Sequence, residues 1–168
     1  MGEIVRLWLH LLGAAVWVGS QVFVFAVVVP MLHTLDDRQA RLKAVRVMTR
    51  NFGWLGWAAL LGQVATGFWL LGSVEFDYRE FRYGRVLDAK LLLVMLTVGL
   101  TALHTFILGP RMLRLMGDGS QPLTADEETK LLKLRKQSGI ISAVTLLLAI
   151  LIIGGAATLT STWARQPV

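Results

Sequence analysis

Three ionisable side chains, His10, Lys90 and His104, interrupt long apolar stretches of the sequence. A charged group at the centre of a membrane helix costs about 2.5 to 3.5 kcal/mol on insertion scales, so a group retained there is a candidate functional residue. Imidazole is a common metal ligand and carries protons near neutral pH. A lysine amine can ligate a metal or haem iron when burial favours its neutral form. These three residues therefore carry most of the chemistry that the sequence offers.

Helical spacing shows which residues share a face with these groups, because positions three, four and seven apart lie on one side of a helix. The stripe headed by His10 contains Gly13, Trp17 and Ser20, and Trp17 is deep enough to pack inside. Polar or small residues follow the same spacing on three other stretches: Lys90, Thr97, Thr101 and His104; Gln63, Thr66 and Gly67; and Ser142, Thr145, Ala149, Ala156 and Thr160. We expect these stripes to point into a helical bundle.

Depth along the helices separates the ionisable groups into two sets. His10 and Lys90 each lie about one turn inside the outer end of their apolar stretch, so they could line one outer site, with Met95 deeper. His104 lies roughly 25 Å from the outer face, near the opposite side, because each helical residue rises about 1.5 Å. We expect it to be a core group bonded to Thr101 or to a backbone carbonyl. This separation disfavours a haem held by two histidines.

Four apolar stretches must position these residues. The chain has 168 residues, 55% hydrophobic and 17% charged, with no cysteine. Its mean hydropathy is +0.60. Residues 7–29, 52–73, 87–108 and 139–159 are each long enough to cross a hydrocarbon core of about 30 Å as a helix. The sequence therefore predicts an all-α, integral membrane four-helix bundle, a single domain over residues 1–168. The absence of cysteine excludes disulfides and thiolate metal sites.

Local signals refine this prediction. Pro30 and Pro110 follow the first and third stretches and can tilt or kink the helix ends without removing the spans. Thr124 and Glu127 form a capping box ahead of a basic segment that we expect to run into the fourth span. Both halves of the chain consist of helix, loop and helix, without a residue-level repeat. Five tryptophans near span ends are expected to lie at the membrane interface: Trp8, Trp54, Trp57, Trp69 and Trp163.

The positive charge, formally +6, lies between the apolar stretches rather than on a polar domain. This distribution argues against nucleic-acid binding and favours a lipid bilayer with anionic headgroups as the partner. The basic residues between the spans are Arg38, Arg41, Lys43, Arg46 and Arg50 in the first loop, and Arg111, Arg114, Lys130, Lys133, Arg135 and Lys136 in the third. In the middle loop, Arg79, Arg82 and Arg85 are offset by Glu75, Asp77 and Glu80. Loops one and three are therefore expected in the cytoplasm, with both termini outside, in the periplasm.

At these residues the chain resembles the copper-resistance CopD-like membrane domain. The resemblance rests on His10-Leu-Leu-Gly-Ala-Ala-Val-Trp17-Val-Gly19 with Pro30, on Arg50, Phe52 and Thr66-Gly67, and on Tyr83-Gly84-Arg85-Val-Leu-Asp-Ala-Lys90, continuing to His104 and Pro110. It covers the first three spans. That family typically has Asn-Arg-Phe where this chain has His104-Thr105-Phe106, so a role for His104 is particular to this chain or its subgroup. The first-span His and Trp with the third-span Lys are also similar to HemJ-like proteins, which bind haem b.

The resemblance implies a multi-pass protein of the bacterial inner (plasma) membrane that transports or delivers copper. Copper would bind at His10 and Met95, with a periplasmic copper-binding protein or a second copy of the chain as partner. The alternative is a haem b protein in electron transfer or porphyrin metabolism, with His10, Trp17, Lys90 and His104 around the cofactor. A third interpretation is a structural or assembly subunit that uses the small residues of the fourth span. The sequence shows no nucleophile with a base, no paired carboxylates in the spans and no phosphate loop, so we expect a transport or binding protein rather than an enzyme.

Overall fold

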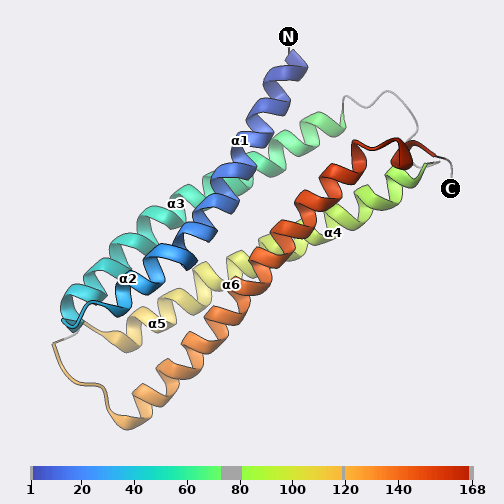
Figure 1. The fold of residues 1–168 in the computed structure, drawn as a ribbon. Coiled ribbons are helices and arrows are strands. Elements are labelled where there is room, and N and C mark those ends of the chain that lie inside the picture. Colours follow the sequence, from blue (N-terminus) through green and yellow to red (C-terminus); the bar gives the residue numbers. More distant parts are fainter. Residues whose placement is uncertain (1, 73–80, 119, 167–168) are drawn as a thin grey trace.

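The computed structural model describes residues 2–72, 81–118 and 120–166, and all regular elements in these ranges are helices (Figure 1). In chain order they are α1 (Gly2–Phe23), η1 (Val24–Val28), α2 (Val29–His33), α3 (Arg38–Leu71), α4 (Arg82–Ala102), η3 (Leu103–Leu108), α5 (Gly109–Met116), α6 (Ala125–Leu159) and η4 (Thr162–Arg165). They form four continuous runs, Gly2–His33, Arg38–Leu71, Arg82–Met116 and Ala125–Leu159, each long and apolar enough to cross a membrane. The all-α, four-helix membrane bundle is therefore confirmed.

The four runs pair as two helix hairpins. In the N-terminal hairpin (residues 2–71), α1 packs mainly on α3, and in the C-terminal hairpin (residues 82–159), α4 packs mainly on α6. Figure 1 shows the two hairpins side by side, with the α2–α3 and α5–α6 ends together and both termini towards the other end. The predicted middle loop, with Glu75, Asp77, Arg79 and Glu80, lies outside the described residues.

The basic residues of the predicted first loop, from Arg38 to Arg50, lie on helix α3. Helix α3 begins at Arg38, because the side chain of Asp37 accepts a hydrogen bond from the Gln39 N–H at 2.9 Å and caps the first turn. The predicted capping box is confirmed, since Thr124 Oγ1 accepts from the Glu127 N–H at 3.3 Å and Glu127 Oε2 accepts from the Thr124 N–H at 2.9 Å. Helix α6 then runs without a break into the fourth span, as predicted.

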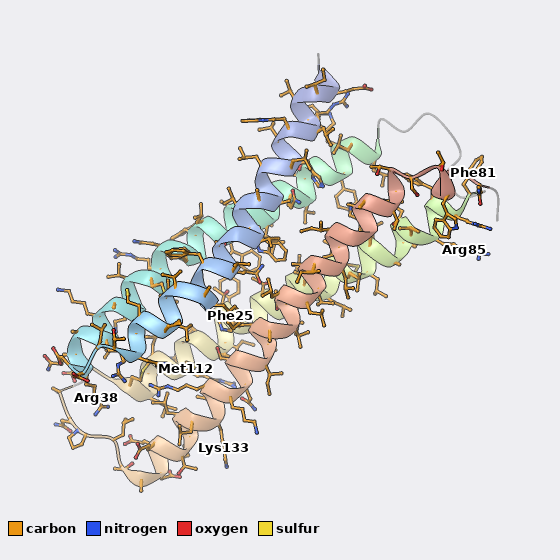
Figure 2. All side chains as sticks on the ribbon, in the orientation of Figure 1. Phe25, Arg38, Phe81, Arg85, Met112 and Lys133 are labelled. Atoms are coloured by element: carbon orange, nitrogen blue, oxygen red, sulfur yellow. The ribbon has the colours of Figure 1, made fainter. Side chains whose placement is uncertain are left out.

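The helical runs are longer than the membrane requires. A run of 35 residues, such as Ala125–Leu159, extends for about 50 Å against a hydrocarbon core of about 30 Å. The excess carries the basic residues of α3, α5 and α6 beyond the core at the end that Figure 2 marks by Arg38 and Lys133. Phe81 and Arg85 lie at the opposite end (Figure 2). The assignment of the basic end to the cytoplasm stays a prediction.

A π-helical turn precedes Pro30 in the first run, and another precedes Pro110 in the third. The Val29 N–H donates to the Val24 carbonyl, five residues back, and the Gly109 N–H donates to the His104 carbonyl in the same way. A proline ring clashes with the carbonyl four residues before it, so widening the preceding turn keeps the helix continuous. The prolines therefore leave both spans intact, as expected. They also occupy the same place in each hairpin, which reveals a repeat of backbone geometry that the sequence comparison of the halves did not detect.

The bundle is apolar outside and narrow at its centre. Large apolar side chains such as Leu92 and Phe106 are exposed on the surface that faces lipid. Inside, Trp17, Leu60 and Ala149 form the buried apolar core, and Thr97 is buried at 1% exposure. We call these four residues the central plug. It lies midway along the bundle, where both hairpins contribute a residue from each of their helices.

Candidate functional site

An outer cavity of about 110 Å³ lies between the two hairpins, on the side of the central plug towards the termini. His10, Lys90 and Gln63 supply its polar groups, and the remaining lining is mainly apolar, from all four long helices. Trp17 closes its inner end. The structure thus brings together His10, Lys90 and Trp17, as the helical spacing and depth of the sequence predicted.

The imidazole of His10 is held by helix α3. Its Nδ1 lies 2.8 Å from Thr66 Oγ1, and the Thr66 hydroxyl is 2.7 Å from the Gly62 carbonyl. A hydroxyl has one proton, and the carbonyl can only accept, so the consistent assignment has Thr66 donating to Gly62 and His10 Nδ1–H donating to Thr66. Nε2 is then the atom with the free lone pair.

Gly67 allows this close approach. A Cβ at position 67 would lie 3.3 Å from His10 Cε1, which is tighter than an ordinary van der Waals contact. Gly13 plays a similar part for the second polar group of the cavity, because a Cβ there would lie 3.1 Å from Gln63 Oε1. The small residues that the sequence placed on these two stripes therefore serve to bring the polar side chains against the facing helix.

Lys90 faces the same cavity from α4 and is half-buried. Among residues 2–72, 81–118 and 120–166 it has no ion pair and no hydrogen-bond partner. His10 lines the same cavity of about 110 Å³, so the charge of Lys90 acts on whatever binds at the imidazole. A protonated Lys90 therefore makes the outer cavity unfavourable for a cation, whereas a neutral Lys90 offers it a second nitrogen ligand.

An inner cavity of about 180 Å³ lies on the other side of the plug. Its lining comes from all four helical runs, and the first, third and fourth runs supply these hydroxyl, amide and imidazole groups: Ser20, Gln21, Thr101, His104, Thr105, Ser142 and Thr145. His104 Nε2 lies 2.7 Å from Ser138 Oγ on α6. The prediction that His104 bonds to Thr101 or to a backbone carbonyl is therefore wrong, because the ring contacts a side chain of the neighbouring helix. As predicted, His104 does not share a site with His10.

The central plug separates the cavities. Trp17 lines both, with 6% of its surface exposed, and Thr97 lines the outer one from the facing hairpin. His10, Trp17 and Val24 follow one another at intervals of seven residues on the first span, and Lys90, Thr97 and His104 do so on the third. Each interval corresponds to about 10 Å along the helix. The interior is therefore built as three levels, outer, central and inner, with one residue of each triplet at each level.

The structure does not bring Met95 to His10. The Met95 side chain is 72% exposed, on the side of α4 away from the cavity, since it lies about 140° around the helix from Lys90. The predicted metal pair of these two residues is therefore wrong within one chain. In the described part of the chain, no group of three or more His, Cys, Asp or Glu side chains could hold a metal ion.

Trp57 is the residue of the interior that sequence reasoning missed. It was expected at the membrane interface, but it is half-buried, lines the inner cavity and packs on Phe106 with ring centroids 5.4 Å apart. A signal was present, because Gly53, Trp57, Leu60 and Gln63 continue the stripe of the second span at helical spacing. Its position near the start of an apolar stretch was misleading, since helix α3 extends well beyond that stretch.

The comparisons with known proteins place this chain in a family. No curated protein and no solved structure shows significant similarity to it. Residues 12–121 match a family model, so the match includes Trp17, Lys90 and His104, while His10 lies just before it and α6 follows it. Because the matched segment covers more than half of the chain, the protein belongs to the family described as "Domain of unknown function (DUF4149)".

Proposed function

We propose that this multi-pass membrane protein handles copper in the inner membrane, taking up the ion as Cu(I) at His10 and passing it across. Two arguments support the proposal: the CopD-like resemblance of the first three spans, and the free Nε2 of His10 in a cavity between the hairpins. The single observation that carries it is the contact of His10 Nδ1 with Thr66 Oγ1 at 2.8 Å. Metal-binding histidines commonly have their second nitrogen fixed by such a bond, which sets the tautomer and the ring orientation.

The ligand count favours transient binding. Imidazole suits copper, and Cu(I) accepts few ligands, but a storage site would need further soft ligands near His10. Besides His10, the polar residues that line the cavity are Gln63, Lys90 and Thr97, and none of them offers a soft ligand. A single oriented imidazole binds an ion weakly enough for it to dissociate again, as transport of the ion requires. The ion would come from a periplasmic copper-binding protein as donor.

Lys90 in this proposal limits how tightly the ion is held. Its ammonium group opposes a cation on His10, and the opposition is strong in an apolar cavity where the effective dielectric constant is low. Replacing Lys90 by Leu removes the charge and adds no ligand. We expect the Lys90→Leu variant to bind Cu(I) several-fold more tightly and to release it more slowly, whereas Lys133→Leu, at the basic end, changes neither.

Haem b, the alternative from the HemJ-like similarity, is less well matched. Pockets for drug-sized ligands measure roughly 300 to 1,000 Å³, whereas the outer cavity measures about 110 Å³. His104 opens to the other cavity, so a second imidazole is not available at the level of His10. The described residues therefore do not fit a haem in this arrangement. An absorption spectrum of the purified protein without a Soret band is the expected result.

The interpretation as an assembly subunit loses part of its basis. Of the small residues on the fourth span, Ala149 lies in the buried core and Ser142 lines the inner cavity. They pack within this chain instead of offering a surface for another protein. A Cβ at Gly155, further along the same span, would meet nothing within 4 Å. An assembly role would therefore use the surface around Gly155 and the apolar side chains that face lipid.

Copper binding is tested with the purified protein in lipid nanodiscs, titrated with Cu(I) in competition with a chromophoric chelator. We expect one Cu(I) per chain and a loss of at least tenfold in affinity for His10→Ala. His33→Ala is the matched control, because His33 is exposed near the basic end. Met95→Leu is expected to bind as the wild type does. Equal affinities of His10→Ala and the wild type would overturn the proposal.

A further inference from the structure

Four buried polar atoms have no hydrogen-bond partner among the residues that the structure describes: Gln63 Oε1, Thr97 Oγ1, Thr101 Oγ1 and Trp57 Nε1. Such atoms are rare in protein interiors and call for water or a ligand. These four atoms are distributed along the bundle. Gln63 lines the outer cavity, Thr97 belongs to the central plug, and Thr101 and Trp57 line the inner cavity. They therefore follow the axis of the bundle from one cavity to the other.

The two threonines differ from others in the same bundle. Thr66 and Thr145 satisfy their hydroxyls by donating to the carbonyl four residues earlier, at 2.7 and 2.8 Å. Thr97 and Thr101 make no such bond, although α4 offers the same carbonyls. They lie one turn apart, about 6 Å along the helix. Their hydroxyls are thus available to groups in the interior on both sides of Trp17.

We propose that the two cavities are the outer and inner halves of one hydrated path across the membrane, closed in this structure by the central plug with Trp17 as its gate. Water bridges unsatisfied polar groups where a cavity is polar and large enough, and both cavities exceed the volume of several water molecules. The plug is apolar apart from Thr97, and narrow apolar constrictions close pores by excluding water. This inference rests on the proposed copper function only for the identity of the ion that the path would carry.

Movement of the hairpins relative to each other would open the plug. Its residues come from both hairpins, Trp17 and Leu60 from one, Ala149 and Thr97 from the other. Each hairpin is internally well packed, whereas contacts between the hairpins are fewer. Separation at Trp17 would join the outer cavity with the inner one and expose the hydroxyl of Thr97 to both.

Cysteine accessibility tests the path directly, because the chain has no cysteine of its own. Single variants Gln63→Cys and Thr101→Cys are reconstituted in vesicles and treated from either side with a permanently charged methanethiosulfonate. We expect Gln63→Cys to react from the outer side and Thr101→Cys from the inner side, each at least tenfold faster than Met95→Cys. Met95 is the matched control because it lies at a similar depth but faces lipid. Rates no higher than that of Met95→Cys would overturn the path.

The gate is tested in the same variants. Trp17→Ala is expected to make Thr101→Cys react from the outer side, with a rate at least tenfold above that with Trp17 present, whereas Trp17→Phe keeps the wild-type sidedness. If Trp17→Ala does not fold, Leu60→Ala is used instead, because it removes a plug side chain from the neighbouring helix. We expect the same change in sidedness. Unchanged sidedness in the folded alanine variants would show that the plug is not a gate.

The two proposals fail in different ways. Loss of Cu(I) binding at His10 with the labelling pattern intact would overturn the cargo and leave the path. Copper binding at His10 without labelling at Gln63 and Thr101 would overturn the path and leave a binding protein. Flux of Cu(I) into vesicles that contain a fluorescent chelator links the two, and we expect it to fall at least tenfold in His10→Ala.

Discussion

His10 and Lys90 occupy matching positions in the two hairpins and face one cavity. Each lies 20 residues before the proline of its run, Pro30 or Pro110, and the π-helical turns before those prolines match as well. An internal repeat usually places its binding site at the interface of the halves, near their common axis. Here the two halves supply unlike groups, an imidazole and an amine. The matching backbones of the two hairpins thus place His10 and Lys90 opposite one another at the cavity. Because the two side chains differ, the cavity contains one imidazole ligand and one amine.

The bond between His10 and Thr66 is expected to control metal affinity. Thr66→Val removes the acceptor of the His10 Nδ1–H and keeps the shape of the side chain, so the ring loses its fixed tautomer. Loss of such a partner typically costs 10- to 100-fold in metal affinity. Thr66→Ser retains the hydroxyl and is the control. Competitive Cu(I) titration of the two variants measures the difference, and equal affinities would show that Thr66 does not orient His10.

Gly67 is expected to be sensitive to a single methyl group. The Cβ of Gly67→Ala would lie 3.3 Å from His10 Cε1, so the imidazole has to shift. We expect a several-fold loss of Cu(I) affinity with little change in thermal unfolding. Gly62→Ala on the same helix is the matched control, because a Cβ there meets nothing within 4 Å. If both variants lose affinity equally, the effect comes from helix α3 as a whole and not from contact with His10.

The contact between His104 and Ser138 is expected to stabilise the inner end of the C-terminal hairpin. Side-chain hydrogen bonds between membrane helices contribute about 0.6 kcal/mol on average in double-mutant cycles. We expect a coupling free energy of this order from His104→Ala, Ser138→Ala and the double variant, measured by reversible unfolding in mixed micelles. A coupling of zero would contradict the 2.7 Å contact.

The cap of α6 is expected to weaken in acid. Hydrogen bonds from the Thr124 backbone N–H, and then from its hydroxyl, hold the pKa of Glu127 below its ordinary value of 4.5. A lowered pKa in the folded state means that the stabilisation is present above pH 4.5 and is lost as the pH falls through the folded pKa. Glu127→Gln should therefore lower the unfolding temperature slightly at pH 7, on the order of 1 °C. The gap between variant and wild type should close as the pH falls below 4.5 and through the folded-state pKa, and a gap that stays constant over an acid titration contradicts the assignment.

The basic end of the bundle is expected to bind anionic lipid. Arg111, Arg114, Lys130 and Lys133 line one open pocket of about 390 Å³ between α5 and α6. Each basic residue near an anionic surface contributes roughly 1 kcal/mol. The double variant Arg111→Gln/Lys133→Gln should lose on the order of tenfold or more in affinity for phosphatidylglycerol, measured by native mass spectrometry. Arg85→Gln, at the opposite end, should bind as the wild type does.

The sequence alone was sufficient for the four membrane spans and for half of the site. Four spans follow from hydrophobic length, because a hydrocarbon core tolerates little else. His10 and Lys90 could be paired since helical rise converts sequence distance into depth. The capping box at Thr124 is a local motif, and local motifs depend on few long-range contacts.

The tertiary structure decided what depends on rotation and on contacts between helices. Met95 and Lys90 are five residues apart and lie on different sides of one helix, and the packing of α4 shows which side faces lipid and which faces the cavity. The partner of His104 is Ser138 and not Thr101 or a backbone carbonyl, because side chains of neighbouring helices meet only after the hairpin has packed. The repeat of the two halves is likewise a property of the backbone, which keeps its π turns and prolines while most side chains differ. Sequence spacing therefore determined depth and element type, and packing determined which of those residues share a site.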